Sequence, residues 1–231
     1  MKKSQKNGSE SGTKNWNKLL FIVVAVMFAV AMVFTYLMPL FTAPRTAQTG
    51  DLAVIGYTIR DEAGMPVLTT DQQLVQDEQQ NNHLVVLTSR LEIPVGMAVS
   101  GENIAPVPIY YPQGSGFDGF GLLGFETNAI SAALVGMHAG ESRSVRFDYG
   151  QNDLTMNISA ENAAALGIEF SNATVGDKFT VGLTTTPEIP LGENSTPSVA
   201  LRIGEVVEKT AEGLVIRYHY AGADLTLQGV A

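Results

Sequence analysis

Cysteine is absent from this chain of 231 residues, which also has only three histidines and one tryptophan. The lack of cysteine excludes disulfides, thiol catalysis and Cys-based zinc sites, so an exported domain must hold together through its hydrophobic core alone. The three histidines, His83, His138 and His219, are scattered along the sequence and do not favour a metal enzyme. We therefore expect neither a metal ion nor a cofactor.

Charge is missing from one long segment, residues 19–41, which reads LLFIVVAVMFAVAMVFTYLMPLF. At about 1.5 Å rise per residue, a helix of this length spans the roughly 30 Å hydrocarbon core of a bilayer. Five lysines and a single glutamate precede the segment. Short basic flanks stay in the cytoplasm. The sequence therefore predicts a single-pass protein of the cell membrane, with a cytoplasmic N-terminus and an extracytoplasmic C-terminal domain.

A cleavable signal peptide is the main alternative to a retained anchor. Small residues at Thr42-Ala43 and Thr46-Ala47 could support cleavage. Cleavable apolar regions usually run for only about 7–15 residues, however, and a soluble core helix rarely has so long a run without charge. The length of the segment favours a retained anchor.

The 190 residues after the apolar segment are acidic, with nine Lys and Arg against 22 Asp and Glu, a formal charge of −13. A domain of this charge is soluble and is repelled by nucleic acid. We expect no nucleic-acid partner.

Alternating and helical patterns along this acidic region predict an α+β protein rich in antiparallel β-structure. Strands are expected at residues 52–59, near 67, and at 83–93, 142–149, 178–183, 199–206, 213–218 and 225–230. One helix is expected behind Asn128 as N-cap, with Gly140 closing the segment. A second is expected at 160–166, with Ser159 as N-cap and Gly167 after its end. Residues 70–82 suggest a loop or irregular helix, and 94–124 a long loop or flap rich in Gly, Pro and aromatics.

Three blocks of the sequence resemble FKBP-type peptidyl-prolyl cis-trans isomerases of the SlyD-like kind. The first is Gly50-Asp51 followed by AVIGYTIRDEAGMPVLTT, and the second is ISAALVGMHAGESRSVRFDYG at residues 130–150. The third joins VGDKF at 175–179 to GEVVEKTAEGLVIRYHYAGADLTLQGV at 204–230. The blocks follow the order of that family.

The resemblance implies an antiparallel sheet wrapped on a short helix, with a small β-rich insert-in-flap domain. The expected segments are a disordered basic tail at 1–18, a transmembrane helix at 19–41, a linker at 42–49, an FKBP-like domain at 50–151 to which strand 225–231 returns, and an insert-in-flap-like domain at 152–224. The resemblance also implies that the partners of this protein are proline-containing unfolded or exported polypeptides.

The same resemblance implies a set of site residues. An FKBP accelerates isomerisation with an apolar, aromatic-lined cleft that favours the twisted amide. Tyr57 would wall this cleft, Ile130 would form its floor, and the Tyr149 hydroxyl would donate to a substrate carbonyl. Substrate-binding positions are implied at Val67, Leu68, Phe120 and Phe125.

The chain departs from the family where Val67-Leu68 replaces the usual Phe-Asp pair. Two functions are therefore expected in order: a membrane-anchored prolyl isomerase and folding helper, or a catalytically degenerate holdase or peptide-binding module of the same fold. A third alternative is an anchored structural or adhesion domain whose aromatic loop at 110–125 packs against a partner.

Overall fold

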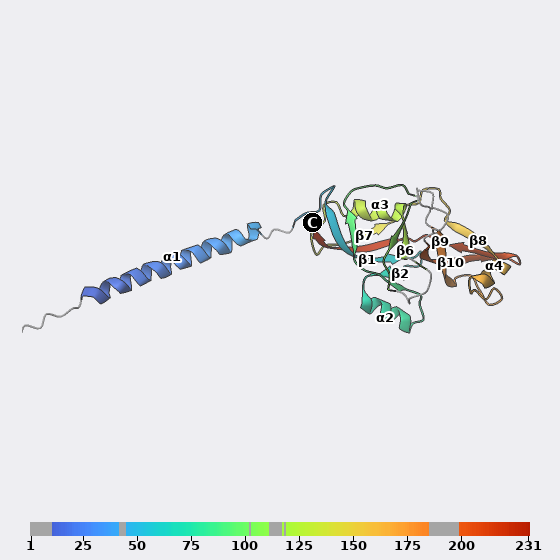
Figure 1. Ribbon diagram of the computed structural model, residues 1–231, viewed down its shortest axis with the longest axis horizontal. Helices are drawn as coiled ribbons and strands as arrows, with labels where there is room; N and C mark the ends of the chain where they lie inside the picture. Colours follow the sequence, from blue (N-terminus) through green and yellow to red (C-terminus); the bar gives the residue numbers. More distant parts are fainter. Residues whose placement is uncertain (1–10, 42–44, 102, 111–116, 118, 185–198) are drawn as a thin grey trace, which may run out of the picture. The chain divides into compact units, whose positions relative to one another are not determined.

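A computed structural model describes the chain except for residues 1–10, 42–44, 102, 111–116, 118 and 185–198. It divides into two compact units, Met1–Pro44 and Arg45–Ala231 (Figure 1). Parts of the expected tail, linker and flap thus lie outside the described residues.

The first unit is built on α1 (Ser11–Phe41), a helix of 31 residues. Its window Lys18–Thr35 has a mean hydropathy of 2.6, and none of that window is buried. The side chains described along it are exposed, and from Leu19 to Phe34 they are all apolar. The helix is therefore long and apolar enough to cross a membrane, as the sequence predicts.

The first of two six-stranded sheets lies in the second unit and has the order β3-β2-β1-β12-β7, with β4 also paired to β1. Its strands are β1 (Leu52–Arg60), β2 (Pro66–Thr69), β3 (Val86–Leu87), β4 (Leu91–Pro94), β7 (Ser142–Arg146) and β12 (Gly222–Val230). The first and last strands of the unit, β1 and β12, pair antiparallel along most of their length (Figure 1). The C-terminal end of the chain therefore completes the sheet that the N-terminal end of the unit begins.

The second sheet has the order β5-β6-β10-β11-β8, with β9 also paired to β10. Its strands are β5 (Ile104–Val107), β6 (Gly119–Leu123), β8 (Thr155–Ser159), β9 (Lys178–Thr184), β10 (Val199–Lys209) and β11 (Gly213–Arg217). The long strand β10 pairs with β6, β9 and β11, so it organises the sheet.

Three short helices accompany the sheets: α2 (Gln72–Gln80), α3 (Gly124–Ala133) and α4 (Ala160–Ala165). The Asp71 carboxylate caps α2 by accepting from the N–H groups of Gln73 and Leu74. The Ser159 hydroxyl caps α4 as predicted, and Gly167 follows that helix with a φ of +74°. Both caps satisfy backbone donors that the first helical turn leaves unpaired.

Two hydrophobic cores fill the second unit. The larger packs β1, β2 and β12 against α3 and includes Tyr57, Phe120, Ile130 and Leu225. The smaller gathers apolar side chains from α4, β8, β10 and β11, all between residues 158 and 216. Strand β10 contributes side chains to both cores, because Leu201 and Ile203 pack in the larger core and Val206 packs in the smaller one. The division into FKBP-like and insert-in-flap domains stays a prediction.

The α+β class is confirmed, and most strand pairs are antiparallel, but both sheets are mixed. Strand β3 pairs parallel to β2, and β6 pairs parallel to β10. Residues 70–82 contain a regular capped helix, α2, and the expected strand at 83–93 is divided into β3 and β4. The segment 94–124 contributes β5 and β6 to the second sheet, because its apolar residues pair with each other and with β10.

The helix α3 begins earlier than predicted. Its N-cap is Leu123, and the Glu126 carboxylate accepts from the Leu123 N–H. Asn128 lies inside the helix, where its side-chain amide exchanges two hydrogen bonds with the backbone of Val99. The predicted cap residue thus fastens a neighbouring loop instead.

Gly124 opens α3 at a point of very close backbone approach. A Cβ built at this position would collide with the backbone carbonyl of Ser100. We expect Gly124→Ala to destabilise the domain by about 1–3 kcal/mol, as overpacking does. Urea denaturation would measure the effect, with Gly136→Ala as a comparison whose Cβ meets open space but whose φ is +79°. An unchanged midpoint for Gly124→Ala would contradict the close approach.

Candidate functional site

A buried ion pair joins the second sheet to α3. Arg202 on β10 and Glu126 on α3 are both fully buried and pair at 2.7 Å between Nη2 and Oε1 and at 3.0 Å between Nη1 and Oε2. The guanidinium also donates to the carbonyl oxygens of Gly121 and Tyr218. Burial alone would lower the pKa of Arg202, but the Glu126 carboxylate raises it, so the arginine stays charged.

Two tyrosines complete this buried polar cluster of Glu126, Arg202, Tyr149 and Tyr220. The Tyr149 hydroxyl donates to Glu126 Oε1 at 2.8 Å and accepts from the Tyr220 N–H at 3.1 Å. Burial and the Glu126 carboxylate both raise the pKa of Tyr149 above its ordinary value. The Tyr220 ring lies 4.3 Å from the Arg202 guanidinium carbon, in a cation–π contact. The hydroxyl predicted to meet a substrate is therefore engaged inside the protein.

Tyr57 is buried in the larger core at a different place. Its hydroxyl shares a hydrogen bond of 3.2 Å with Thr88 Oγ1, and its N–H donates to Thr70 Oγ1. Burial raises the pKa of Tyr57 to about 12, despite the opposing hydrogen bond from Thr88. At neutral pH Tyr57 is thus a neutral phenol held in place by two threonines.

A cavity of about 330 Å³, here called the aromatic pocket, lies beside Tyr149 without including it. It is lined by Gly101, Ile104, Leu123, Phe125, Asn152, Leu154, Leu183, Thr184 and Tyr218. The Phe125 ring contacts the Tyr149 ring edge-on, with the centroids 5.9 Å apart. This pocket combines two aromatic rings and four aliphatic side chains with few polar groups.

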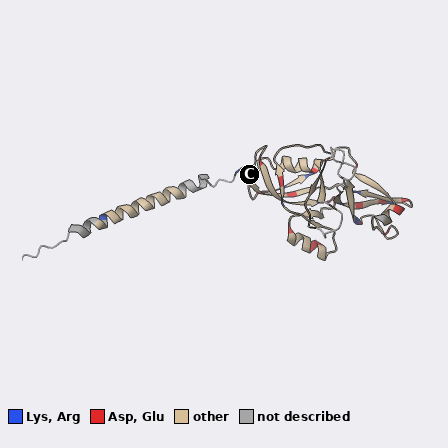
Figure 2. Cartoon of the chain, viewed as in Figure 1, with Lys and Arg blue, Asp and Glu red and all other residues tan. Residues whose placement is uncertain are grey.

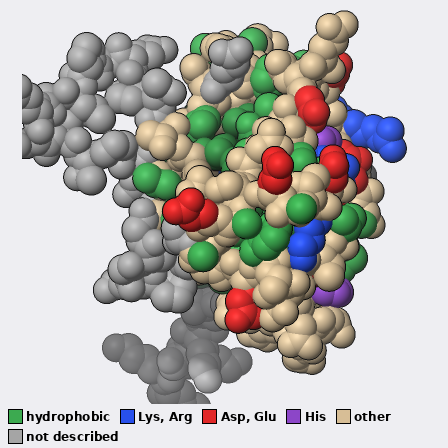
Figure 3. Space-filling view, turned by 90° about the vertical axis from the view of Figure 1, so that its right-hand side faces the viewer, with side chains coloured by type: hydrophobic (Ala, Val, Ile, Leu, Met, Phe, Trp, Pro, Cys, Tyr) green, Lys and Arg blue, Asp and Glu red, His purple; other side chains and the backbone are tan. Residues whose placement is uncertain are grey.

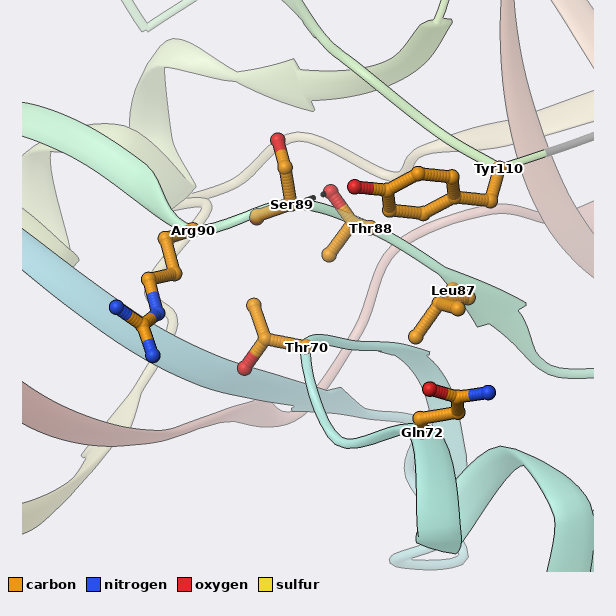
Figure 4. Close-up of a pocket in the computed structure, with 7 residues that line it drawn as sticks. All are labelled: Thr70, Gln72, Leu87, Thr88, Ser89, Arg90 and Tyr110. Atoms are coloured by element: carbon orange, nitrogen blue, oxygen red, sulfur yellow. Dashed lines mark hydrogen bonds between the residues drawn. The ribbon is translucent and has the colours of Figure 1, made fainter.

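Figure 4 shows a larger and more open cavity of about 760 Å³, here called the polar groove. It is lined by Thr70, Gln72, Leu87, Thr88, Ser89, Arg90 and Tyr110. Two of these residues also hold Tyr57, since Thr88 shares a hydrogen bond with its phenol and Thr70 accepts from its backbone N–H.

The structure thus divides the residues that the sequence predicts for one site. Tyr57, Val67, Leu68, Phe120 and Ile130 are buried in the larger core. Tyr149 belongs to the buried polar cluster, and Phe125 lines the aromatic pocket. As far as the described residues define them, neither the pocket nor the groove is lined by Tyr57, Ile130 or Tyr149.

Sequence reasoning missed Arg202, Glu126 and Tyr218. Arg202 is the only charged residue between Glu193 and Glu205, inside an apolar strand, and a lone charge in such a run signals a buried pair. Glu126 is likewise isolated between Asp118 and Glu141. Nothing in the sequence joins the two, because 76 residues separate them.

Comparison with known proteins adds no family: no family model matches the chain, and no curated protein matches it. Within the part of the chain that the structure describes, no group of three His, Asp or Glu residues could hold a metal ion. Within the described residues, the molecule is thus an α+β protein with one helix able to span a membrane, and the aromatic pocket and the polar groove are its candidate sites.

Proposed function

We propose that this protein is a membrane-anchored polypeptide-binding protein of the extracytoplasmic side, which holds proline-containing or apolar segments of unfolded or exported chains. The observation that carries this proposal is the aromatic pocket, with Phe125 and Tyr218 among its walls. The basic N-terminal tail supports the orientation, because lysines flanking a membrane helix stay in the cytoplasm.

The pocket suits a proline ring or another compact apolar side chain. Its volume of about 330 Å³ lies at the lower end of the range for ligand sites, which are mostly apolar with a few polar groups. Asn152 and Thr184 supply the polar groups, so a bound segment could bury its side chain while its backbone meets hydrogen-bonding partners. The face shown in Figure 3 carries hydrophobic side chains among separate acidic and basic ones.

The even distribution of acidic residues favours binding of unfolded chains over selection of a partner by its charge. The Asp and Glu residues are spread over many helices and strands of the domain instead of forming one patch (Figure 2). Such a surface keeps the domain soluble without selecting a strongly basic partner.

The internal hydrogen bond of the Tyr149 hydroxyl favours polypeptide binding over catalysis. The hydroxyl that the family resemblance assigns to the substrate carbonyl donates to Glu126 and is buried. A donor already satisfied inside the protein gains nothing when the substrate amide twists, so it does not stabilise that transition state selectively.

Prolyl isomerisation is the second candidate function. An apolar pocket can favour the twisted amide without any titratable group, and the barrier that it must lower is about 18–20 kcal/mol. The aromatic walls at Phe125 and Tyr218 are the observation that favours this candidate.

Replacing Phe125 by alanine tests the proposal. We expect Phe125→Ala to weaken binding of a fluorescent proline-containing peptide about tenfold, because truncating an aromatic anchor of a pocket typically costs more than about 1 kcal/mol. Fluorescence anisotropy with the full chain in detergent would measure it, with Val175→Ala as a control at an exposed apolar residue that lines neither cavity. Equal affinity of Phe125→Ala and wild type would refute the pocket as the binding site.

The same preparations separate the two candidate functions. The binding protein is expected to delay aggregation of an unfolded client without accelerating cis-to-trans isomerisation of proline peptides. Acceleration that is lost in Phe125→Ala would instead establish the isomerase.

A further inference from the structure

Besides the Tyr110 hydroxyl, the polar groove contains three polar side chains that make no hydrogen bond or ion pair within the described part of the chain: Arg90, Ser89 and Gln72. Arg90 lies toward one end of the groove and Gln72 toward the other, with Thr70 between them (Figure 4). Two other hydroxyls of the lining are already used, because Thr70 accepts from Tyr57 and Thr88 donates to the Pro108 carbonyl. The groove therefore offers three polar groups that are free to meet a ligand.

The charge of the groove is opposite to that of the domain. Among the described residues of its lining, Arg90 is the only charged one, although the chain carries nine more acidic than basic side chains. Asp71 lies in sequence between the lining residues Thr70 and Gln72. Its Oδ1 accepts from the N–H groups of Gln73 and Leu74 at the start of α2. An exposed guanidinium without a carboxylate partner recognises an external carboxylate by paired, charge-assisted hydrogen bonds.

The backbone beside Arg90 also lacks backbone partners within the residues described. Residues 87–90 line the groove in sequence between β3 and β4. Leu87 and Thr88 make backbone hydrogen bonds to Tyr110 and Thr69. Within the residues described, Ser89 and Arg90 make no bond to another backbone group, although the Ser89 carbonyl accepts from the Thr88 hydroxyl at 3.4 Å. An extended peptide can add its own backbone groups to such an unpaired stretch.

We propose that the polar groove binds the carboxylate of an extended polypeptide, with Arg90 pairing with the carboxylate and Ser89 and Gln72 adding hydrogen bonds. The exposed ring of Tyr110, 68% accessible, packs against the side chain that precedes the carboxylate. This inference rests on the proposed polypeptide binding and adds a second subsite to it, outside the aromatic pocket. The carboxylate can belong to the end of the chain or to an acidic side chain.

Three fluorescent peptides of the same apolar, proline-containing sequence test this subsite: one with a free C-terminal carboxylate, one amidated, and one amidated with an internal glutamate. They are titrated against the full chain in detergent micelles, with Arg90→Gln, Arg90→Lys and the matched control Arg146→Gln, an exposed arginine of β7. We expect Arg90→Gln to weaken binding of a carboxylate peptide about tenfold, since a hydrogen bond to a charged group contributes about 1.5–3 kcal/mol. Arg90→Lys should restore part of the affinity, and Arg146→Gln should change nothing.

The three arms give distinct outcomes. A gain from the free terminus alone identifies a chain end as the ligand, and an equal gain from internal glutamate identifies an acidic side chain. If the amidated, acid-free peptide binds through Phe125 but neither carboxylate adds affinity, the groove proposal is overturned while the proposed function stands. If that acid-free peptide does not bind at all, the proposed function fails. In that case the groove proposal stands only if a carboxylate peptide still binds and Arg90→Gln weakens its binding.

Discussion

Replacing Arg202 by alanine is expected to destabilise the domain by about 3–5 kcal/mol, the range for breaking a buried ion pair by removing one partner. The substitution leaves the Glu126 carboxylate buried without its cation and deprives the carbonyls of Gly121 and Tyr218 of their donor. It also empties the space under the Tyr220 ring. Thermal and urea denaturation of the full chain would show a fall in melting temperature on the order of 10 °C.

Two further variants separate the charge from the packing. In the double variant Arg202→Met with Glu126→Leu no buried charge remains, so we expect it to be markedly more stable than Arg202→Ala. Tyr149→Phe removes only the hydroxyl that donates to Glu126 and should cost about 1–3 kcal/mol. If Arg202→Ala were as stable as wild type, the guanidinium would have to reach solvent, and the buried pair would be wrong.

Placing two arginines in the middle of α1, as Val26→Arg with Val30→Arg, is expected to release the chain from membranes. Each central arginine costs about 2.5–3.5 kcal/mol on insertion, so the pair removes most of the advantage of the apolar helix. Both positions lie in the window Lys18–Thr35. Carbonate extraction followed by immunoblotting would measure the membrane-bound fraction, with Val26→Leu as the matched apolar control.

The mature mass distinguishes the anchor from a cleaved signal. Intact-mass measurement of the wild-type protein is expected to show that residues 19–41 are retained, together with recovery in the membrane pellet. A mature chain that starts near residue 43 or 47 and stays in the supernatant would establish cleavage instead.

Helices and strands were predictable wherever the residues that determine them lie close together in the sequence. Ser159 and Gly167 bracket α4 as their capping preferences require, and β1, β9 and β11 lie within one residue of the expected ranges. The prediction failed where long-range pairing overrode composition. Residues 94–124 were expected to form a loop because of their Gly and Pro content, yet β6 is a fully buried strand beside β10.

The candidate sites were less predictable than the elements. Phe125 was identified from the sequence and does line a cavity, but the tyrosines expected to share that site lie elsewhere. Tyr57 points to Thr88 of the polar groove, and Tyr149 points to Glu126 in the buried polar cluster. A tyrosine on a strand carries no local sign of which buried partner its hydroxyl will meet.

The sequence by itself determined the apolar helix, the acidic character of the domain and the α+β class, because hydropathy, charge and periodicity are properties of neighbouring residues. Only the tertiary structure decided that Arg202 meets Glu126 across 76 residues, that Arg90 is left without a partner in the described chain, and that Phe125 and Tyr218 enclose one pocket. The physical reason is that pairing and cavity shape depend on contacts between distant segments, which are fixed when the two sheets and α3 pack together.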